Sequence, residues 1–215
     1  MRAAVLGAND GIISTSSLLV GIAAAHASHS NMLLTGFAGL VAGSMSMATG
    51  EYVSVSSQAD TENAAMKQEQ AELAHDPDAE HRELASIYVQ RGLDLSLAQE
   101  VATQLMAHDA LGTHARDELG LSEATQVRPL QAALASALSF AVGAAMPLAI
   151  TAVTRADMLI GILVATTLVG LAGLGALAAK TGGAPALPAA LRVTCWTALA
   201  MGATVAIGSA FDVGV

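Results

Sequence analysis

Carboxylate pairs at helical spacing are the groups in this chain best suited to chemistry. Glu69 and Glu72 are three residues apart, as are Glu80 and Glu83, so each pair lies on one face of a helix. Two such pairs facing each other would form a carboxylate cage of the type that holds divalent iron or manganese in helical bundles. Acidic residues at this spacing also occur on many solvated helix surfaces, so the spacing alone leaves both interpretations open.

Three further residues could complete such a cage. Asp117 and Glu118 are adjacent in the sequence, and His114 precedes Glu118 by about one helical turn. Their oxygen and nitrogen atoms are suitable ligands for a divalent transition metal. The remaining histidines of this region are interpreted as surface residues: His75, His81 and His108.

Asp10 is a candidate of a different kind, because it lies within an apolar segment. A charged side chain near the centre of a membrane helix costs about 2.5 to 3.5 kcal/mol on insertion scales, so it usually marks a pathway or a paired site. Asn9 adds a second oxygen ligand, and Gly11 would allow the helix to loosen around an ion. Alternatively, Asp10 lies close enough to the helix end to reach the lipid headgroups.

Two methionines in the next apolar segment could take part in the same pathway. The thioethers of Met45 and Met47 are soft, uncharged ligands, which can pass a cation onward without trapping it. Methionine is also a common packing residue, and that alternative stays open. Glu51 follows near the predicted end of the membrane segment, where its carboxylate could feed ions toward Asp10 or face solvent.

The composition places these residues in a membrane protein. The chain is 53% hydrophobic and 13% charged, whereas soluble domains contain about 25% charged residues. A net charge of −9 argues against a nucleic-acid partner and favours a cationic one. The single cysteine, Cys195, excludes an intramolecular disulfide and a zinc site built from several thiolates.

Five apolar segments are long enough to cross a hydrocarbon core about 30 Å thick. They cover residues 3–25, 32–55, 130–153, 158–179 and 187–211. We therefore predict an all-α integral membrane protein with two spans in residues 1–57 and three in residues 130–215. Glycines four residues apart, at Gly7 and Gly11 and at Gly39 and Gly43, predict close contacts between membrane helices.

Residues 58–129 form a polar insertion between the second and third predicted spans. Fourteen of the eighteen acidic residues and four of the six histidines lie in it. We predict three helices, over residues 58–74, 77–91 and 95–110. Pro77 suits the first turn of the second of these helices, and Gly92 suits its end.

The basic residues predict the orientation of the chain. In a five-span arrangement, eight of the nine Lys and Arg residues lie on one side and only Arg155 on the other. Because short cytoplasmic flanks accumulate Lys and Arg, the N-terminus and the insertion are expected in the cytoplasm and Val215 outside. We expect the first segment to be a retained span, since no small-residue cleavage site follows it.

Three motifs resemble the vacuolar iron transporter family in a bacterial form. They are GANDG at residues 7–11, GSMSMATGEY at residues 43–52 and SSQAD at residues 56–60. The resemblance covers essentially the whole chain. It implies a homodimer in a lipid bilayer, with a path between the subunits that exchanges divalent iron or manganese for protons.

The resemblance also implies roles for individual residues. Asp10 and Met47 would line the path, and metal would be bound in the cytoplasm by Glu69, Glu72, Glu80, Glu83 and Glu118. His114 and Ala115 stand where some relatives carry methionines, and Gly39 stands where some carry an acid. These departures alter the softness of the cytoplasmic site and the charge within the membrane.

The expected function is therefore export of ferrous iron, manganese or both from the cytosol by proton antiport. The cytoplasmic site is expected to bind other divalent metals as well. Burial favours the neutral form of a carboxylate and a bound cation favours its charged form, so Asp10 could couple the two flows. The chain is expected to be a transporter of the bacterial cytoplasmic membrane and not an enzyme. The alternatives are a membrane-anchored ferroxidase or iron store, and a metal-sensing module that recruits a partner.

Overall fold

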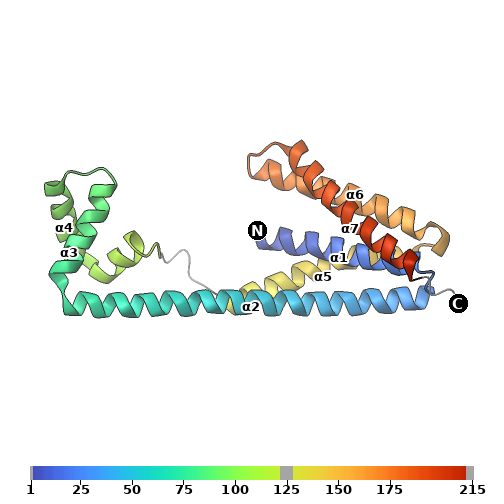
Figure 1. Cartoon of the computed structure of the whole chain (residues 1–215), viewed down its shortest axis with the longest axis horizontal. Coiled ribbons are helices and arrows are strands. Elements are labelled where there is room, and N and C mark those ends of the chain that lie inside the picture. The colour runs from blue at the N-terminus through green and yellow to red at the C-terminus, as the bar shows by residue number, and fades with distance from the viewer. Residues whose placement is uncertain (1, 122–127, 212–215) are drawn as a thin grey trace. The chain divides into compact units, whose positions relative to one another are not determined.

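The computed structural model describes residues 2–121 and 128–211, and these form seven helices without a strand (Figure 1). The helices are α1 (Arg2–Ala24), α2 (His29–His75), α3 (Pro77–Gln90), α4 (Leu95–Asp117), α5 (Pro129–Val153), α6 (Ala156–Thr181) and α7 (Ala186–Ala210). The all-α prediction is confirmed. The expectation that Val215 lies outside the cell falls beyond the described residues.

Four helices of the described chain are long and apolar enough to cross a membrane, namely α2, α5, α6 and α7. The first predicted span, α1, is not among the helices that meet this criterion within the described residues. The structure is thus that of a membrane protein, and the fifth span stays a prediction.

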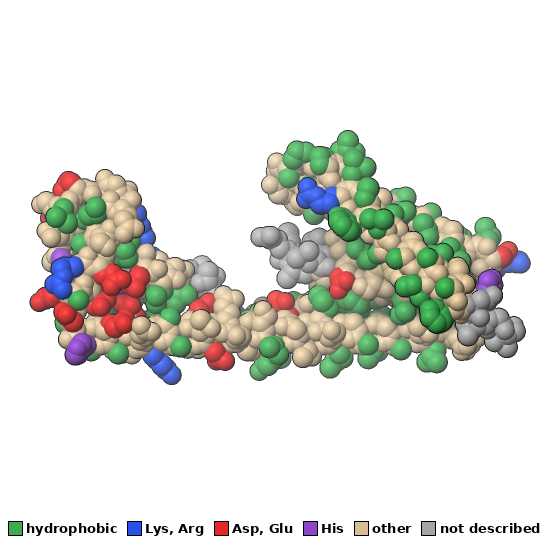
Figure 2. All heavy atoms as spheres, viewed as in Figure 1, with side chains coloured by type: hydrophobic (Ala, Val, Ile, Leu, Met, Phe, Trp, Pro, Cys, Tyr) green, Lys and Arg blue, Asp and Glu red, His purple; other side chains and the backbone are tan. Residues whose placement is uncertain are grey.

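The chain divides into two compact units. The first comprises Met1–Tyr52 and Leu130–Val215 and is called the bundle below, and the second, Val53–Pro129, is called the acidic unit. Helix α2 has 47 residues and contributes to both, because its apolar first half continues without a break into a polar, Ala- and Glu-rich second half. Apolar side chains crowd the bundle in Figure 2, and Asp and Glu side chains gather on the acidic unit.

In the bundle, α1 packs against α6 and α7, which also pack against each other. The core contains six buried residues from four helices: Leu19, Val20, Met32, Leu159, Leu163 and Met201. A buried hydrogen bond of 2.8 Å joins the hydroxyls of Ser16 and Thr167 across α1 and α6. This bond satisfies two buried hydroxyls between helices, in a part of the bundle where lipid offers no alternative partner.

Glycines bring α1 and α5 into backbone contact. A Cβ atom added at Gly11 would overlap the backbone of Phe140, and one added at Gly143 would overlap the backbone of Ala8. On α2, a Cβ at Gly43 would overlap the ring of Phe140. The glycines at four-residue spacing thus serve contacts between helices of one chain.

The acidic unit is built on the pairing of α3 with α4. Leu84 and Ala85 of α3 pack against Ala98 and Ala102 of α4. Each helix begins at an aspartate whose carboxylate accepts a backbone N–H bond, a common way to cap a helix: Asp76 accepts from Ala79 and Asp94 from Leu97. Helix α4 extends seven residues beyond the predicted end at 110.

Candidate metal centre

The structure brings four potential metal ligands together in the acidic unit. Glu69 of α2, Glu80 of α3, and His114 and Glu118 at the end of α4 have ligand atoms that all lie within 4.8 Å of one another. His114 Nδ1 is 3.0 Å from Glu69 Oε1 and 2.9 Å from Glu118 Oε2, and it is 3.8 Å from Glu80 Oε2. We call these four residues the metal centre.

The metal centre is largely shielded from solvent. His114 is 0% exposed and Glu69 only 2%, and Glu80 is also buried, whereas Glu118 is exposed. Within the described part of the chain, the buried Nε2 atom of His114 has no hydrogen-bond partner, and the buried Oε1 atom of Glu69 has none beyond its 3.0 Å contact with His114 Nδ1. Buried polar atoms are normally satisfied, so the centre has unused capacity to bind a ligand.

The electrostatics of the centre favour a cation. Burial raises the pKa of Glu69 to about 7, and repulsion by Glu118 adds to this, against the opposing effect of His114. Burial, followed by repulsion from Glu83, also raises the pKa of Glu80. Each shift reflects the cost of ionising a carboxylate that lacks a compensating positive charge. A divalent cation would supply that charge.

Two glutamates that were predicted as metal ligands, Glu72 and Glu83, are not among the four residues of the metal centre. Each predicted pair has one buried member, Glu69 or Glu80, and one exposed member, Glu72 or Glu83. Glu72 accepts a hydrogen bond of 3.0 Å from Gln68, and neither exposed glutamate belongs to the four-residue group.

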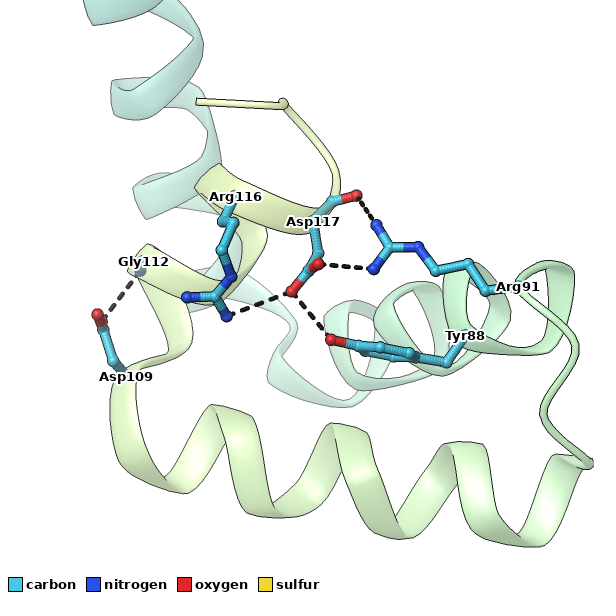
Figure 3. Close-up of polar contacts among 6 residues, drawn as sticks. All are labelled: Tyr88, Arg91, Asp109, Gly112, Arg116 and Asp117. Carbon is cyan, nitrogen blue, oxygen red and sulfur yellow. Dashed lines mark hydrogen bonds and ion pairs between the residues drawn. The ribbon is translucent and has the colours of Figure 1, made fainter. Parts of the chain in front are cut away.

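A break in α4 determines how His114 and Glu118 approach the other ligands. Asp109 has non-helical angles (φ −159°, ψ 90°), and its carboxylate accepts a 3.0 Å bond from the backbone N–H of Gly112 (Figure 3). A Cβ at Gly112 would overlap that carboxylate, so glycine leaves room for the cap. The final helical segment, which the sequence interpretation missed, begins here and carries His114 and Glu118. The sequence Asp-Ala-Leu-Gly is the signal that marks this restart.

Asp117 is not part of the metal centre. Its Oδ1 atom accepts a 2.7 Å bond from Arg91, and its Oδ2 atom accepts bonds of 2.9 Å from Tyr88 and 3.3 Å from Arg116 (Figure 3). Burial alone would raise the pKa of Asp117, but these hydrogen bonds together hold it below its usual range. Asp117 was predicted to be a metal ligand, yet its carboxylate is already engaged by Tyr88, Arg91 and Arg116.

A cavity of about 210 Å³ in the bundle contains part of the predicted path. Its lining comprises Asp10, Ser14, Thr15, Leu18, Gly39, Gly43, Ser46, Met47 and Phe140. Ser14 donates a 2.9 Å hydrogen bond to Asp10 Oδ1. The serines that line this cavity were not predicted, although Ser14 lies one turn after Asp10 and Ser46 beside Met47.

The other predicted path residues lie elsewhere. Met45 is 62% exposed on the outside of α2, and neither it nor Glu51 lines the cavity. Asn9 does not line it either, but its buried Oδ1 atom has no hydrogen-bond partner among the described residues. The structure thus places Asp10 and Met47 at one cavity, whose lining does not include Met45 or Glu51.

Comparison with known proteins decides the family. The family model of the VIT family matches residues 1–209. This chain belongs to the VIT family. Members of the VIT family are transporters, so the predicted resemblance and the expectation of a non-enzymatic function are both confirmed.

Individual VIT-family relatives match over nearly the whole chain. The vacuolar iron transporter of Acanthamoeba castellanii is 43% identical over 209 residues, which cover 97% of this chain and 77% of the relative. Vacuolar iron transporter homolog 4 of Arabidopsis thaliana is 38% identical, covering 97% and 84% of the two chains. Vacuolar iron transporter homolog 1 of Oryza sativa is 36% identical, covering 95% and 70%.

Proposed function

We propose that this protein moves divalent iron across a membrane, and that the metal centre captures the ion before it enters the bundle. The observation that carries this proposal is the largely buried group of Glu69, Glu80, His114 and Glu118, in which Glu69 Oε1 has no hydrogen bond beyond its contact with His114 and Nε2 of His114 has none. A cation is the ligand that removes the electrostatic cost of this arrangement. Iron is proposed as the ion because the similar proteins are named vacuolar iron transporters or their homologs.

The ligand set suits ferrous iron and also admits manganese. Three carboxylates favour hard divalent ions such as manganese, whereas an imidazole favours iron and the later first-row metals. The metal centre combines both kinds of ligand, since His114 Nδ1 faces the three glutamates. Iron is therefore the substrate proposed first, with manganese second.

Within the bundle, the ion would pass the cavity at Asp10 and Met47. Asp10 supplies the negative charge, and Met47 supplies a soft ligand that adds no charge. Asp10 also offers a route to proton antiport, because a carboxylate that releases a metal ion can take up a proton in its place. Ser14, which is bonded to Asp10, would hold its side chain toward the cavity.

A homodimer would give the exposed face of α2 a partner. Four large apolar side chains follow one another there at helical spacing: Leu34, Phe37, Val41 and Met45. A second copy on this face would bring Met45 to the boundary between the subunits, where the proposed path runs. The protein would lie in a bacterial cytoplasmic membrane with α1 as the fifth span, and the distribution of Lys and Arg supports a cytoplasmic acidic unit.

Flux through purified protein in liposomes tests the proposed function. Ferrous iron or manganese would be added outside vesicles that contain a pH-sensitive dye, with and without an imposed proton gradient. We expect metal uptake, acceleration by the gradient and proton flow in the opposite direction. Uptake without proton flow would refute antiport, and metal binding without uptake would make the acidic unit a sensor and the bundle an anchor.

A further inference from the structure

Three side chains hold the end of α4 against α3. Arg91 Nη1 donates a 2.7 Å bond to Asp117 Oδ1, Arg91 Nη2 donates a 2.9 Å bond to the Asp117 backbone carbonyl, and the Tyr88 hydroxyl donates a 2.9 Å bond to Oδ2. The guanidinium also lies over the Tyr88 ring, 5.2 Å from its centre. We call Tyr88, Arg91 and Asp117 the clamp (Figure 3).

The clamp acts on the segment that carries half of the metal ligands. The break at Asp109 separates this segment from the regular part of α4, so the segment does not inherit its direction from the helix before it. Its beginning is held by the cap between Asp109 and Gly112. Its end is held by the clamp, because Arg91 binds both the side chain and the main chain of Asp117.

Of the two metal ligands on this segment, His114 lies between the two attachment points and Glu118 lies just after the second. His114 is three residues before Asp117, and Glu118 directly follows it. In the metal-free protein, repulsion among the glutamates favours movement of Glu118 away from Glu69 and Glu80. A clamp that engages the neighbouring residue opposes this movement without occupying a metal ligand.

The chemistry of the clamp suits a positioning role. Arg91 and Arg116 offset the charge of Asp117, so Asp117 adds little negative charge to the region. A planar guanidinium can bind a carboxylate and a carbonyl at once in a defined geometry, which a lysine ammonium does not reproduce. Residues that orient metal ligands in this way typically change affinity 10- to 100-fold when they are mutated.

We propose that Asp117, held by Tyr88 and Arg91, is a positioning residue that keeps His114 and Glu118 in place to receive a divalent cation. This inference rests on the proposed function of the metal centre. It gives Asp117 a role next to the metal centre, although the proposed ligand is the adjacent Glu118 and not Asp117 itself.

Metal titration of the purified full-length protein tests the proposal. Two probes are used. Binding of ferrous iron is measured by competition in the absence of oxygen, and binding of Co²⁺ is measured by its visible absorption, which reports its ligands. Arg91→Lys keeps the charge but loses the two-point contact, and Tyr88→Phe removes one hydrogen bond. We expect Arg91→Lys and Asp117→Asn to weaken binding about 10- to 100-fold and Tyr88→Phe to weaken it a few fold, with altered Co²⁺ spectra.

Matched variants separate positioning from folding. Arg155→Lys and Asp157→Asn change an exposed ion pair at 3.4 Å in the bundle and should leave the titrations unchanged. A purely structural role would lower the fraction of protein that binds while leaving the affinity and spectrum of that fraction as in the wild type. That result, or wild-type affinity in Arg91→Lys, would overturn the clamp.

The same titration separates the clamp from the metal centre. If Glu118→Gln abolishes binding while Asp117→Asn binds normally, the centre stands and the clamp is wrong. If the wild-type protein binds neither ion, the capture step of the proposed function and the clamp both fail.

Discussion

His114 Nδ1 lies 2.9 Å from Oε2 of Glu118, one helical turn away, and 3.0 Å from Oε1 of Glu69 on another helix. One imidazole nitrogen therefore stands between carboxylates from two elements of the acidic unit. Because His114 is the only potential nitrogen ligand among the four described residues of the metal centre, we expect it to determine how the centre ranks different metals.

Replacing this imidazole should change metal preference as well as affinity. We expect His114→Ala to weaken binding of Co²⁺ and Fe²⁺ by at least about tenfold, since loss of a ligand costs no less than loss of its supporting bonds. Mn²⁺ should lose less, because carboxylates alone suit it. Competition titrations of the three ions would measure this ranking, and an equal loss for all three would contradict it. His108→Ala, on the same helix, is the control.

Metal affinity should depend on pH through Glu69. Its pKa of about 7 means that a proton competes with the metal below neutral pH. We expect the apparent affinity to fall by up to about tenfold for each pH unit below 7. Titrations from pH 8 to pH 5 would measure this slope. Exposed Glu100 offers a matched control, because Glu100→Gln should keep the wild-type slope.

The stability of the metal-free protein should show the opposite dependence. The pKa of Glu69 rises from 4.5 to about 7 in the folded state, so between these values the folded protein binds more protons than the unfolded chain. The stabilising contribution of this group is thus fully present below pH 4.5 and is lost as the pH rises through about 7. Thermal unfolding of the wild type and of Glu69→Gln would measure the difference. A difference that does not change with pH would exclude the shift.

Asp10→Asn should separate transport from capture. Removing the charge at the bundle cavity should reduce flux in liposomes by at least about tenfold, as expected for a polar group that marks an ion pathway. Metal binding by the acidic unit should be unchanged, since its ligands lie in residues 53–129. Asp157→Asn should transport normally. Unimpaired flux through Asp10→Asn would remove this residue from the path.

Gly11→Ala should destabilise the bundle. The added methyl group would overlap the backbone of Phe140, and overpacking of this kind typically costs about 1 to 3 kcal/mol. Gly161→Ala on α6 is the matched control, because nothing lies within 4 Å of a Cβ there. Thermal unfolding in detergent would compare the two, and equal midpoints would mean that α1 and α5 do not approach so closely.

The amino-acid sequence determined the helical elements and the family. Apolar segments of sufficient length predicted α5, α6 and α7 to within a few residues, because covering a membrane demands both length and hydrophobicity. Asp76, Pro77 and Gly92 marked the ends of α3 by local chemistry that needs no tertiary contact. The motifs at residues 7–11 and 43–52 were specific enough to indicate the family.

Only the tertiary structure decided which acidic residues meet. Glu69 and Glu72 share a helix face in the sequence pattern, but packing of α3 and α4 buries Glu69 and leaves Glu72 exposed. Asp117 and Glu118 are adjacent carboxylates, and successive helical residues point about 100° apart, so one meets Arg91 while the other meets His114. Helical spacing defines neighbours along one element, whereas a metal centre requires ligands from three elements whose mutual placement is set by packing and by the break at Asp109.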